Sequence, residues 1–204
     1  MKPLVVVDFG GGNLGSLCAA LGRRGALYLV SDDPEIVEAA PAAIVPGDGA
    51  FGATLAALRA RALDIALLRL LAAERPVLAI CVGMQLFYEA SDEFGEHRGL
   101  AFLPGRIARF GAEAPRIPHM GWNRLEVLHE HAFVRDLGPA PYAYFLHSFR
   151  APVDDATLVT CEHGERFAAI VARGSLVATQ FHPEKSQATG ARLLENFLGI
   201  VSGR

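Results

Sequence analysis

The sequence is poor in cysteine. Three cysteines stand at positions 18, 81 and 161, an odd number at wide spacing. That pattern excludes a disulfide framework and a Cys-x-x-Cys metal site. We therefore expect a reducing, cytoplasmic compartment, in which any special cysteine is special for its reactivity.

An excess of basic charge and long apolar runs are absent as well. The formal net charge is -3, which argues against nucleic acid or an anionic membrane as a partner, because either favours a basic patch. No segment approaches the roughly 20 apolar residues that span a bilayer. The first apolar run, Leu4–Val7, stops at Asp8 without a small-residue cleavage site, so we also expect no signal peptide.

The bulk composition is that of a folded globular protein. Of 204 residues, 51% are hydrophobic and 20% are charged. No repeat, low-complexity tract or linker divides the chain, and its length suits one compact core. We expect residues 1–204 to form a single domain.

The first half alternates short apolar runs with helical patterns. Strands are expected at residues 4–7, 26–30, 42–45 and 76–80. Helices are expected at residues 14–24, 54–73 (with a break near Asp64) and 82–90. This rhythm predicts a parallel sheet with helices on both faces.

The second half changes character. Between residues 100 and 180, short β-like stretches are separated by glycine and proline, and residues 187–201 read as a closing helix. The predicted fold class is therefore α/β, a doubly wound, mostly parallel sheet with flanking helices and added antiparallel hairpins.

Cys81 directly follows the fourth predicted strand. Open parallel sheets place functional groups at the carboxyl ends of their strands, and a helix that begins there lowers the pKa of a thiol. Gly83 leaves room for a sharp strand-to-helix turn, in which the amide of Val82 would face a developing oxyanion. The competing interpretation is a small buried hydrophobe, which is the fate we expect for Cys18 and Cys161.

His182, Pro183 and Glu184 follow the last predicted strand. A thiolate nucleophile needs a neighbouring base that later donates a proton to the leaving group. In an extended segment, residues two apart point the same way, so Glu184 can orient and charge-stabilise the imidazole of His182. Taken alone, the same residues more often form a solvated turn in which His182 and Glu184 are merely exposed.

The loop Pro46–Gly49 follows the third predicted strand. Its glycines let backbone amides approach a ligand, so Gly47 or Asp48 can supply a second oxyanion donor beside Val82. No Walker-type lysine follows the loop, and by itself it is a generic turn.

Taken together, the Pro46–Gly49 loop, the Cys81-Val82-Gly83-Met84-Gln85 turn and the His182-Pro183-Glu184 segment resemble the triad-type (class I) glutamine amidotransferases. The resemblance spans nearly the whole chain. It implies that Cys81 attacks the glutamine carboxamide, that His182 protonates the departing ammonia, and that water hydrolyses the glutamyl thioester. It implies no cofactor of the chain's own.

Further segments are similar to the glutaminase subunits of imidazole glycerol phosphate synthases; these segments are 8–13, 118–123, 144–149 and 181–187. This resemblance implies a role in histidine biosynthesis, as one half of a heterodimer with a (β/α)8-barrel-type cyclase subunit. The cyclase would receive the ammonia and make imidazole glycerol phosphate and aminoimidazole carboxamide ribotide.

The same resemblance implies roles for two further sets of residues. Those expected to hold the substrate glutamine are Gly49, Gln85, His147 and Ser148. Those expected on the face that docks against the cyclase are Asn13, Met120, Trp122 and Lys185. From the residues alone, Trp122 can also be core, although Gly121 and Asn123 beside it indicate a loop.

Three positions depart from the family pattern. Ala79 replaces a glycine two residues before the cysteine, and Phe149 replaces a common tyrosine. Asp48 replaces a hydrophobic residue, which puts a carboxylate near the expected oxyanion site. That carboxylate must point away, pair with a cation, or weaken unassisted activity.

Other functions remain open at the level of sequence. The same chemistry can serve a different ammonia-accepting synthase. A papain-like protease fits poorly, because the chain lacks that fold's order. A non-catalytic flavodoxin-like module could use Gly10–Asn13 to cradle a phosphate, but it would not need the three catalytic candidates. His129 and His131 lack a third metal ligand nearby, so we expect no metal site.

Overall fold

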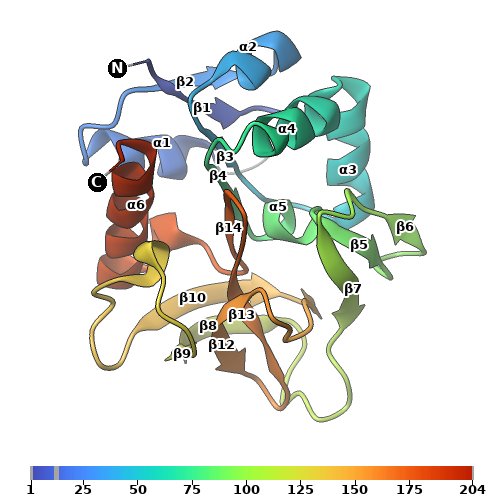
Figure 1. Cartoon of the computed structure of the whole chain (residues 1–204). Coiled ribbons are helices and arrows are strands. Elements are labelled where there is room, and N and C mark those ends of the chain that lie inside the picture. The colour runs from blue at the N-terminus through green and yellow to red at the C-terminus, as the bar shows by residue number, and fades with distance from the viewer. Residues whose placement is uncertain (1, 12–13, 204) are drawn as a thin grey trace.

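The centre of the molecule is an eight-stranded sheet (Figure 1). The computed structural model describes residues 2–11 and 14–203. In spatial order the strands are β2 (Tyr28–Ser31), β1 (Leu4–Val7), β3 (Ala43–Val45), β4 (Val77–Ile80), β14 (Leu176–Thr179), β13 (Arg166–Arg173), β12 (Thr157–Glu162) and β9 (Glu126–Val127). The first five run parallel and the other three antiparallel, which confirms the predicted fold class.

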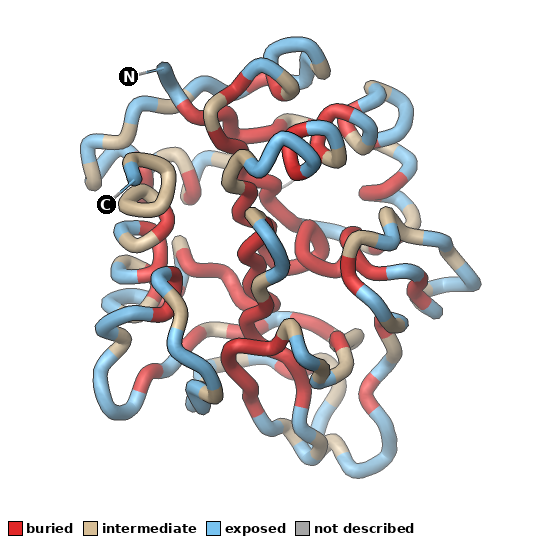
Figure 2. Tube along the Cα trace, viewed as in Figure 1, coloured by how far each residue is buried: buried red, intermediate tan, exposed pale blue. Residues whose placement is uncertain are grey.

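Helices cover both faces of this sheet. On one face lie α1 (Leu14–Gly22) and α6 (Gln187–Val201); on the other lie α2 (Pro34–Ala39), α3 (Phe51–Ala60), α4 (Leu63–Ala72) and α5 (Val82–Gln85). Successive residues of β1 alternate between two buried clusters: Val5 packs with the second group of helices and Val6 with the first. Four of the five parallel strands, β1, β3, β4 and β14, are therefore apolar on both sides and buried throughout their length (Figure 2). The edge strand β2 is partly exposed. In the described ranges, no helix combines the length and apolar character needed to cross a membrane.

Two smaller sheets flank the central one. One pairs β8 (His119–Arg124) with β10 (Tyr142–His147) in antiparallel fashion. The other has the order β11 (Phe149–Arg150), β7 (Leu103–Arg109), β5 (Tyr88–Ser91) and β6 (His97–Arg98). Two short 3-10 helices, η1 (Ala132–Val134) and η2 (Pro183–Lys185), complete the chain.

The expected helix at residues 82–90 is wrong. Helix α5 is a single turn that ends at Gln85, and the chain enters β5 at Tyr88. The segment at 100–103 ends the helix, because the amide of Leu100 donates to the Leu86 carbonyl at 2.8 Å and that of Phe102 to the Phe87 carbonyl at 2.9 Å. These partners come from a distant stretch, so helical periodicity alone could not reveal them.

The loop expected around Trp122 is also wrong, because the residue lies on β8. Gly121 has a φ of 129°, which a strand of other residues would not adopt, and this glycine is what suggested a loop. The break expected near Asp64 is confirmed: Ala62 has a left-handed φ of 54° and separates α3 from α4.

The C-terminal helix α6 packs closely on η2, the short helix that carries Glu184. A Cβ added at Gly190 would stand 1.8 Å from the carbonyl oxygen of Pro183. Because both groups are backbone or rigid, no side-chain rotation can relieve that overlap. Gly190 therefore fixes the distance between α6 and the His182–Glu184 segment.

We predict that Gly190→Ala lowers the free energy of unfolding by about 1–3 kcal/mol or more, through displacement of α6. Gly15→Ala is the matched control: Gly15 lies within α1 with open space around its Cα, so alanine should leave stability unchanged or raise it by up to ~1 kcal/mol. Urea unfolding of both variants makes the comparison. Equal stability of the two would contradict the close packing of α6 on η2.

Candidate active site

Three neighbouring parallel strands bring the three predicted loops together. In the sheet, β4 lies between β3 and β14, with Ala79 opposite Val45 and Ile80 opposite Thr179. The residues that follow these strands therefore leave the same edge side by side. They are the Pro46–Gly49 loop after β3, Cys81 after β4, and the segment from Gln180 to Glu184 after β14.

The loop after β3 touches the backbone of the cysteine turn. A Cβ on Gly47 would stand 2.0 Å from the Ile80 carbonyl oxygen and 2.8 Å from the Val82 nitrogen. A Cβ on Gly83 would stand 2.8 Å from the Val45 carbonyl oxygen. Both glycines are needed because two backbones meet there without room for a side chain. This confirms the expected sharp turn at Gly83.

Cys81 sits at a strained position in this turn. Its φ is 54° and its ψ is -118°, outside the regions that a non-glycine residue ordinarily adopts. Its amide donates to the Thr179 carbonyl at 2.7 Å, which ties the strained residue to β14. In the ranges that the structure describes, the Val82 amide has no hydrogen-bond acceptor, so it is available to one that enters the site.

Helix α5 is short, which limits its electrostatic effect on Cys81. A one-turn helix sums few peptide dipoles, so it stabilises a thiolate less than the expected longer helix would. The charge of His182 must supply most of that stabilisation.

His182 contacts both other members of the predicted triad. Its Nδ1 lies 2.8 Å from Oε1 of Glu184, and its ring is close enough to Cys81 for the sulfur to raise the pKa of the imidazole. All three side chains are buried, with 9% of the His182 side chain and 3% of the Glu184 side chain exposed. With Nδ1 engaged by Glu184, Nε2 is the nitrogen that faces the sulfur.

The pKa of His182 is raised from its ordinary 6.5 to about 10. Burial acts in the opposite direction, since it disfavours the imidazolium. Hydrogen bonds to Cys81 and Glu184, together with the negative charges of those groups, outweigh burial. The site therefore favours the imidazolium form of His182.

Ser186, which the sequence analysis did not single out, holds the histidine segment in place. Its Oγ donates to the His182 carbonyl at 2.7 Å and accepts from the Tyr144 amide at 3.0 Å. Ser186 thereby links the backbone of His182 to β10. The serine side chain's partners come from two separate elements, so no local pattern indicated this role.

Two of the four residues expected to hold glutamine face inward. Gln85 is 4% exposed, and its Nε2 donates to the Phe149 carbonyl at 3.1 Å and to Oε1 of Gln180 at 2.9 Å. His147 is 7% exposed, with Nδ1 2.8 Å from the same carbonyl and Nε2 3.0 Å from Nδ1 of His119. The ring nitrogens of His147 are therefore both engaged within the protein.

The other two border open space. Ser148 lines a cleft of about 480 Å³ together with Asp92, Glu93, Phe94, Ala108, Arg109 and Phe149. Gly49 is exposed and has a φ of 97°. Asp48 is exposed too, so of the options left open by the sequence, its carboxylate points away from the buried turn. Glu93, which the sequence analysis missed, accepts from the Phe51 amide at 2.6 Å and so joins the cleft wall to the start of α3.

The residues expected at a partner interface lie on the surface where they are described. Met120 is 53% exposed, Trp122 is 47% exposed, and Lys185 is exposed. Asn13 lies outside the described residues. The pairing of β8 with β10 sets Leu146 opposite Met120 and Tyr144 opposite Trp122, so apolar side chains share this face.

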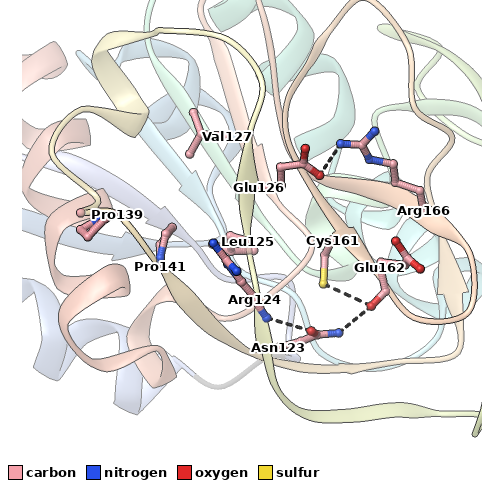
Figure 3. A pocket seen from close by; sticks show the side chains of 11 residues that line it. Asn123, Arg124, Leu125, Glu126, Val127, Pro139, Pro141, Cys161, Glu162 and Arg166 are labelled. Atoms are coloured by element: carbon pink, nitrogen blue, oxygen red, sulfur yellow. Dashed lines mark hydrogen bonds and ion pairs between the residues drawn. The ribbon is translucent and has the colours of Figure 1, made fainter.

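A larger cavity, of about 560 Å³, lies elsewhere on the molecule (Figure 3). Its walls come from β8, β9, β12 and β13, and they include Cys161 and the ion pair between Arg166 and Glu126. None of the residues predicted for catalysis or substrate binding lines it. Burial raises the pKa of Cys161 to about 12, which is typical of an unreactive thiol, as the sequence led us to expect.

The site and fold match one protein family. The family model for class-I glutamine amidotransferases matches residues 5–200, and the chain belongs to this family. Within it, the chain groups with one subunit of a particular synthase. It is 40% identical over 203 residues to the imidazole glycerol phosphate synthase subunit HisH of Salinibacter ruber, covering 96% of the chain and 93% of that relative. It is 43% identical over 194 residues to HisH of Carboxydothermus hydrogenoformans, covering 94% and 96%.

Solved structures support the fold independently. A glutamine amidotransferase with 20% identity superposes with a TM-score of 0.76, over 97% of this chain and 98% of the other. The structure of PurLQS from Thermotoga maritima, at 19% identity, gives 0.72 over 98% and 100%. These similarities confirm the architecture of a class-I glutamine amidotransferase.

We predict that Glu184→Gln lowers the pKa of His182 by ~1 unit or more, because it removes one of the negative partners. In the unchanged protein, the raised pKa of His182 contributes to the free energy of unfolding. This contribution is fully present below pH 6.5 and is lost as the pH rises through about 10. Nuclear magnetic resonance titration of the histidine rings measures both values. A His182 ring that titrates at the same pH in the two proteins would contradict the assigned partnership.

Proposed function

We propose that this chain is the glutaminase subunit of an imidazole glycerol phosphate synthase, with residues 1–204 acting as a single cytoplasmic domain. It hydrolyses glutamine to glutamate and ammonia for a cyclase subunit of the (β/α)8-barrel type. The observation that carries the catalytic part is the meeting of Cys81, His182 and Glu184 at the ends of β4 and β14. The similarity to HisH subunits supports the acceptor.

The first half of the reaction is acyl transfer to sulfur. The Cys81 thiolate attacks the carboxamide carbon, a C–S bond forms, and the carbonyl electron pair moves to oxygen. When that pair returns, the C–N bond breaks and Nε2 of His182 gives its proton to the departing nitrogen, which leaves as ammonia. Glu184 holds the imidazole in the required orientation throughout.

The second half restores the enzyme. Neutral His182 takes a proton from water as the oxygen attacks the thioester carbon. The C–S bond then breaks, glutamate leaves, and the thiolate and imidazolium are again paired.

Stabilisation of the oxyanion falls to backbone amides. The Val82 amide lacks an acceptor within the described ranges and lies against Gly47, so the loop after β3 is close enough to add a second donor. The candidates for that second amide are Gly47 and Asp48. The carboxylate of Asp48 does not interfere with the oxyanion, because the Asp48 side chain is exposed.

The cleft beside the site suits the charged end of free glutamine. An α-amino acid carries an ammonium and a carboxylate, and the cleft offers Asp92 and Glu93 for the first and Arg109 for the second. Ser148 and the backbone of Gly49 add polar contacts. Gln85 and His147 act indirectly, because both side chains hydrogen-bond the Phe149 carbonyl and so orient it.

The outer face of β8 and β10 suits the cyclase. It carries Met120, Trp122, Tyr142 and Leu146, each between 46% and 53% exposed. Aromatic and methionine side chains of this kind often anchor interfaces, whereas isolated apolar residues need no partner. Lys185 and Asn13 are proposed to extend this docking face.

The function is tested by measuring ammonia release from glutamine, with and without a cyclase subunit and its nucleotide ligand. We expect strong release only with the liganded partner, and its loss, by at least about 10³-fold, in Cys81→Ala, because the nucleophile is gone. Full turnover by the isolated chain would contradict dependence on the partner. Turnover that ignores this cyclase would reassign the acceptor, and none under any condition would contradict the glutaminase itself.

We predict that Trp122→Ala weakens binding to the cyclase by ~10-fold or more, because a large exposed aromatic is removed from the centre of the docking face. Ile65→Ala is the matched control, since Ile65 is 51% exposed on α4, away from that face. Isothermal titration calorimetry compares the two. Equal affinities for both variants would rule out β8 as the docking strand.

A further inference from the structure

Behind Cys81 lies a continuous chain of buried hydrogen bonds. Gln180 is fully buried, and its Nε2 donates to Sγ of Cys81 at 3.9 Å. Its Oε1 accepts from Gln85 at 2.9 Å, and its backbone amide donates to the Ala169 carbonyl at 2.9 Å. The buried side chain that contacts the sulfur is therefore held through its amide oxygen and through its own backbone.

The direction of every hydrogen bond in this chain follows from one carbonyl. The oxygen of Phe149 can only accept, so Gln85 must present its NH2 group and His147 its Nδ1–H. Since the Gln85 NH2 group also reaches Gln180, the amide of Gln180 must turn its oxygen to Gln85 and its NH2 group to the sulfur. The assignment at Cys81 is thus set by donors and acceptors elsewhere.

The histidine branch is directional in the same way. With Nδ1 donating to Phe149, Nε2 of His147 must accept, so His119 donates from its own Nδ1. Nε2 of His119 then accepts from Asn123, whose NH2 group also donates to the Glu162 carbonyl at 2.8 Å. Stacking on Phe145 and His163, at centroid distances of 4.7 Å and 4.1 Å, holds the His119 ring.

Both imidazoles must be neutral for this pattern to exist. A proton on Nε2 of His147 would oppose the proton on Nδ1 of His119. Burial lowers the pKa of His147 to about 3 and that of His119 to about 4, so both rings stay neutral at ordinary pH.

We infer that Gln180 is a positioning residue for the nucleophile: its NH2 group holds Sγ of Cys81 and favours the thiolate. The Gln85–Phe149–His147–His119 relay keeps that group turned toward the sulfur. A donor to a charged acceptor favours the charged form, so loss of the donor raises the pH at which Cys81 becomes a thiolate. The inference rests on the proposed function only for its kinetic consequence, since the reactivity of the thiol can be measured without glutamine.

The test is the pH dependence of iodoacetamide alkylation, read by mass spectrometry on the peptide that carries Cys81. Gln180→Met keeps the volume and removes the donor, and we expect the alkylation midpoint to rise by about one pH unit. His119→Phe keeps the stacked ring and breaks the relay at a distance, and a smaller rise is expected. Thr160→Val is the matched control: it removes a buried hydroxyl from β12, outside the relay, and should leave the midpoint unchanged.

A midpoint in Gln180→Met equal to that of the unchanged chain would overturn the inference. If Gln180→Met fails to fold, Gln85→Met tests the same orientation of Gln180 from one step away, with the same expected direction and the same contrary result. In the assay with the liganded cyclase, Gln180→Met should lower kcat by about tenfold and leave KM unchanged. If Cys81 of the unchanged chain is alkylated as expected but the chain releases no ammonia, the proposed function is refuted and the positioning role of Gln180 stands.

Discussion

The contact between two backbones at Gly47 and Gly83 is the constraint on which the rest of the site depends. It brings the loop after β3 against the turn after β4, so closely that a Cβ at either glycine would overlap backbone atoms. The left-handed φ of Cys81 follows from the sharpness of that turn, and the bond from its amide to Thr179 ties the turn to β14. The sheet itself thereby brings the backbone of Gly47, the turn at Cys81 and the start of the segment that carries His182 together.

The electrostatics of the site follow from this packing. Because α5 is a single turn, its dipole is small, and the main positive charge beside Cys81 is the imidazolium of His182. His182 relies in turn on Glu184, whose second oxygen is buried without a partner among the described residues. Ser186 and Gly190 fix the segment that carries both residues against β10 and α6. The strain and the buried charge are supported by packing remote from the chemistry.

Much of this arrangement could be predicted from the sequence, because it depends on local signals. The β-branched run Leu4–Val7, the break near Asp64 and the closing helix α6 are each encoded in consecutive residues. The convergence of the three loops follows from a general property of parallel sheets, namely that strand ends meet at one edge. The motifs that carried the resemblance to the class-I family were therefore confirmed in their placement.

What the sequence could not reveal depends on partners far along the chain. The end of α5 is set by amides at residues 100–103, and β8 exists through its pairing with β10. Gln180 and His119 gain their roles only from a relay that crosses four elements, while Glu93 gains its own by reaching the start of α3. Tertiary pairing overrode local preference at the end of α5 and in β8.

We propose that Cys81, alone among the three cysteines, is the nucleophile for glutamine. The most direct measurement is covalent labelling by a γ-diazoketone analogue of glutamine in the presence of the liganded cyclase, followed by peptide mapping. We expect one label per chain, on Cys81, slowed by added glutamine, with Cys18 and Cys161 unmodified. Labelling that spreads over all three cysteines, or that glutamine fails to slow, would contradict it.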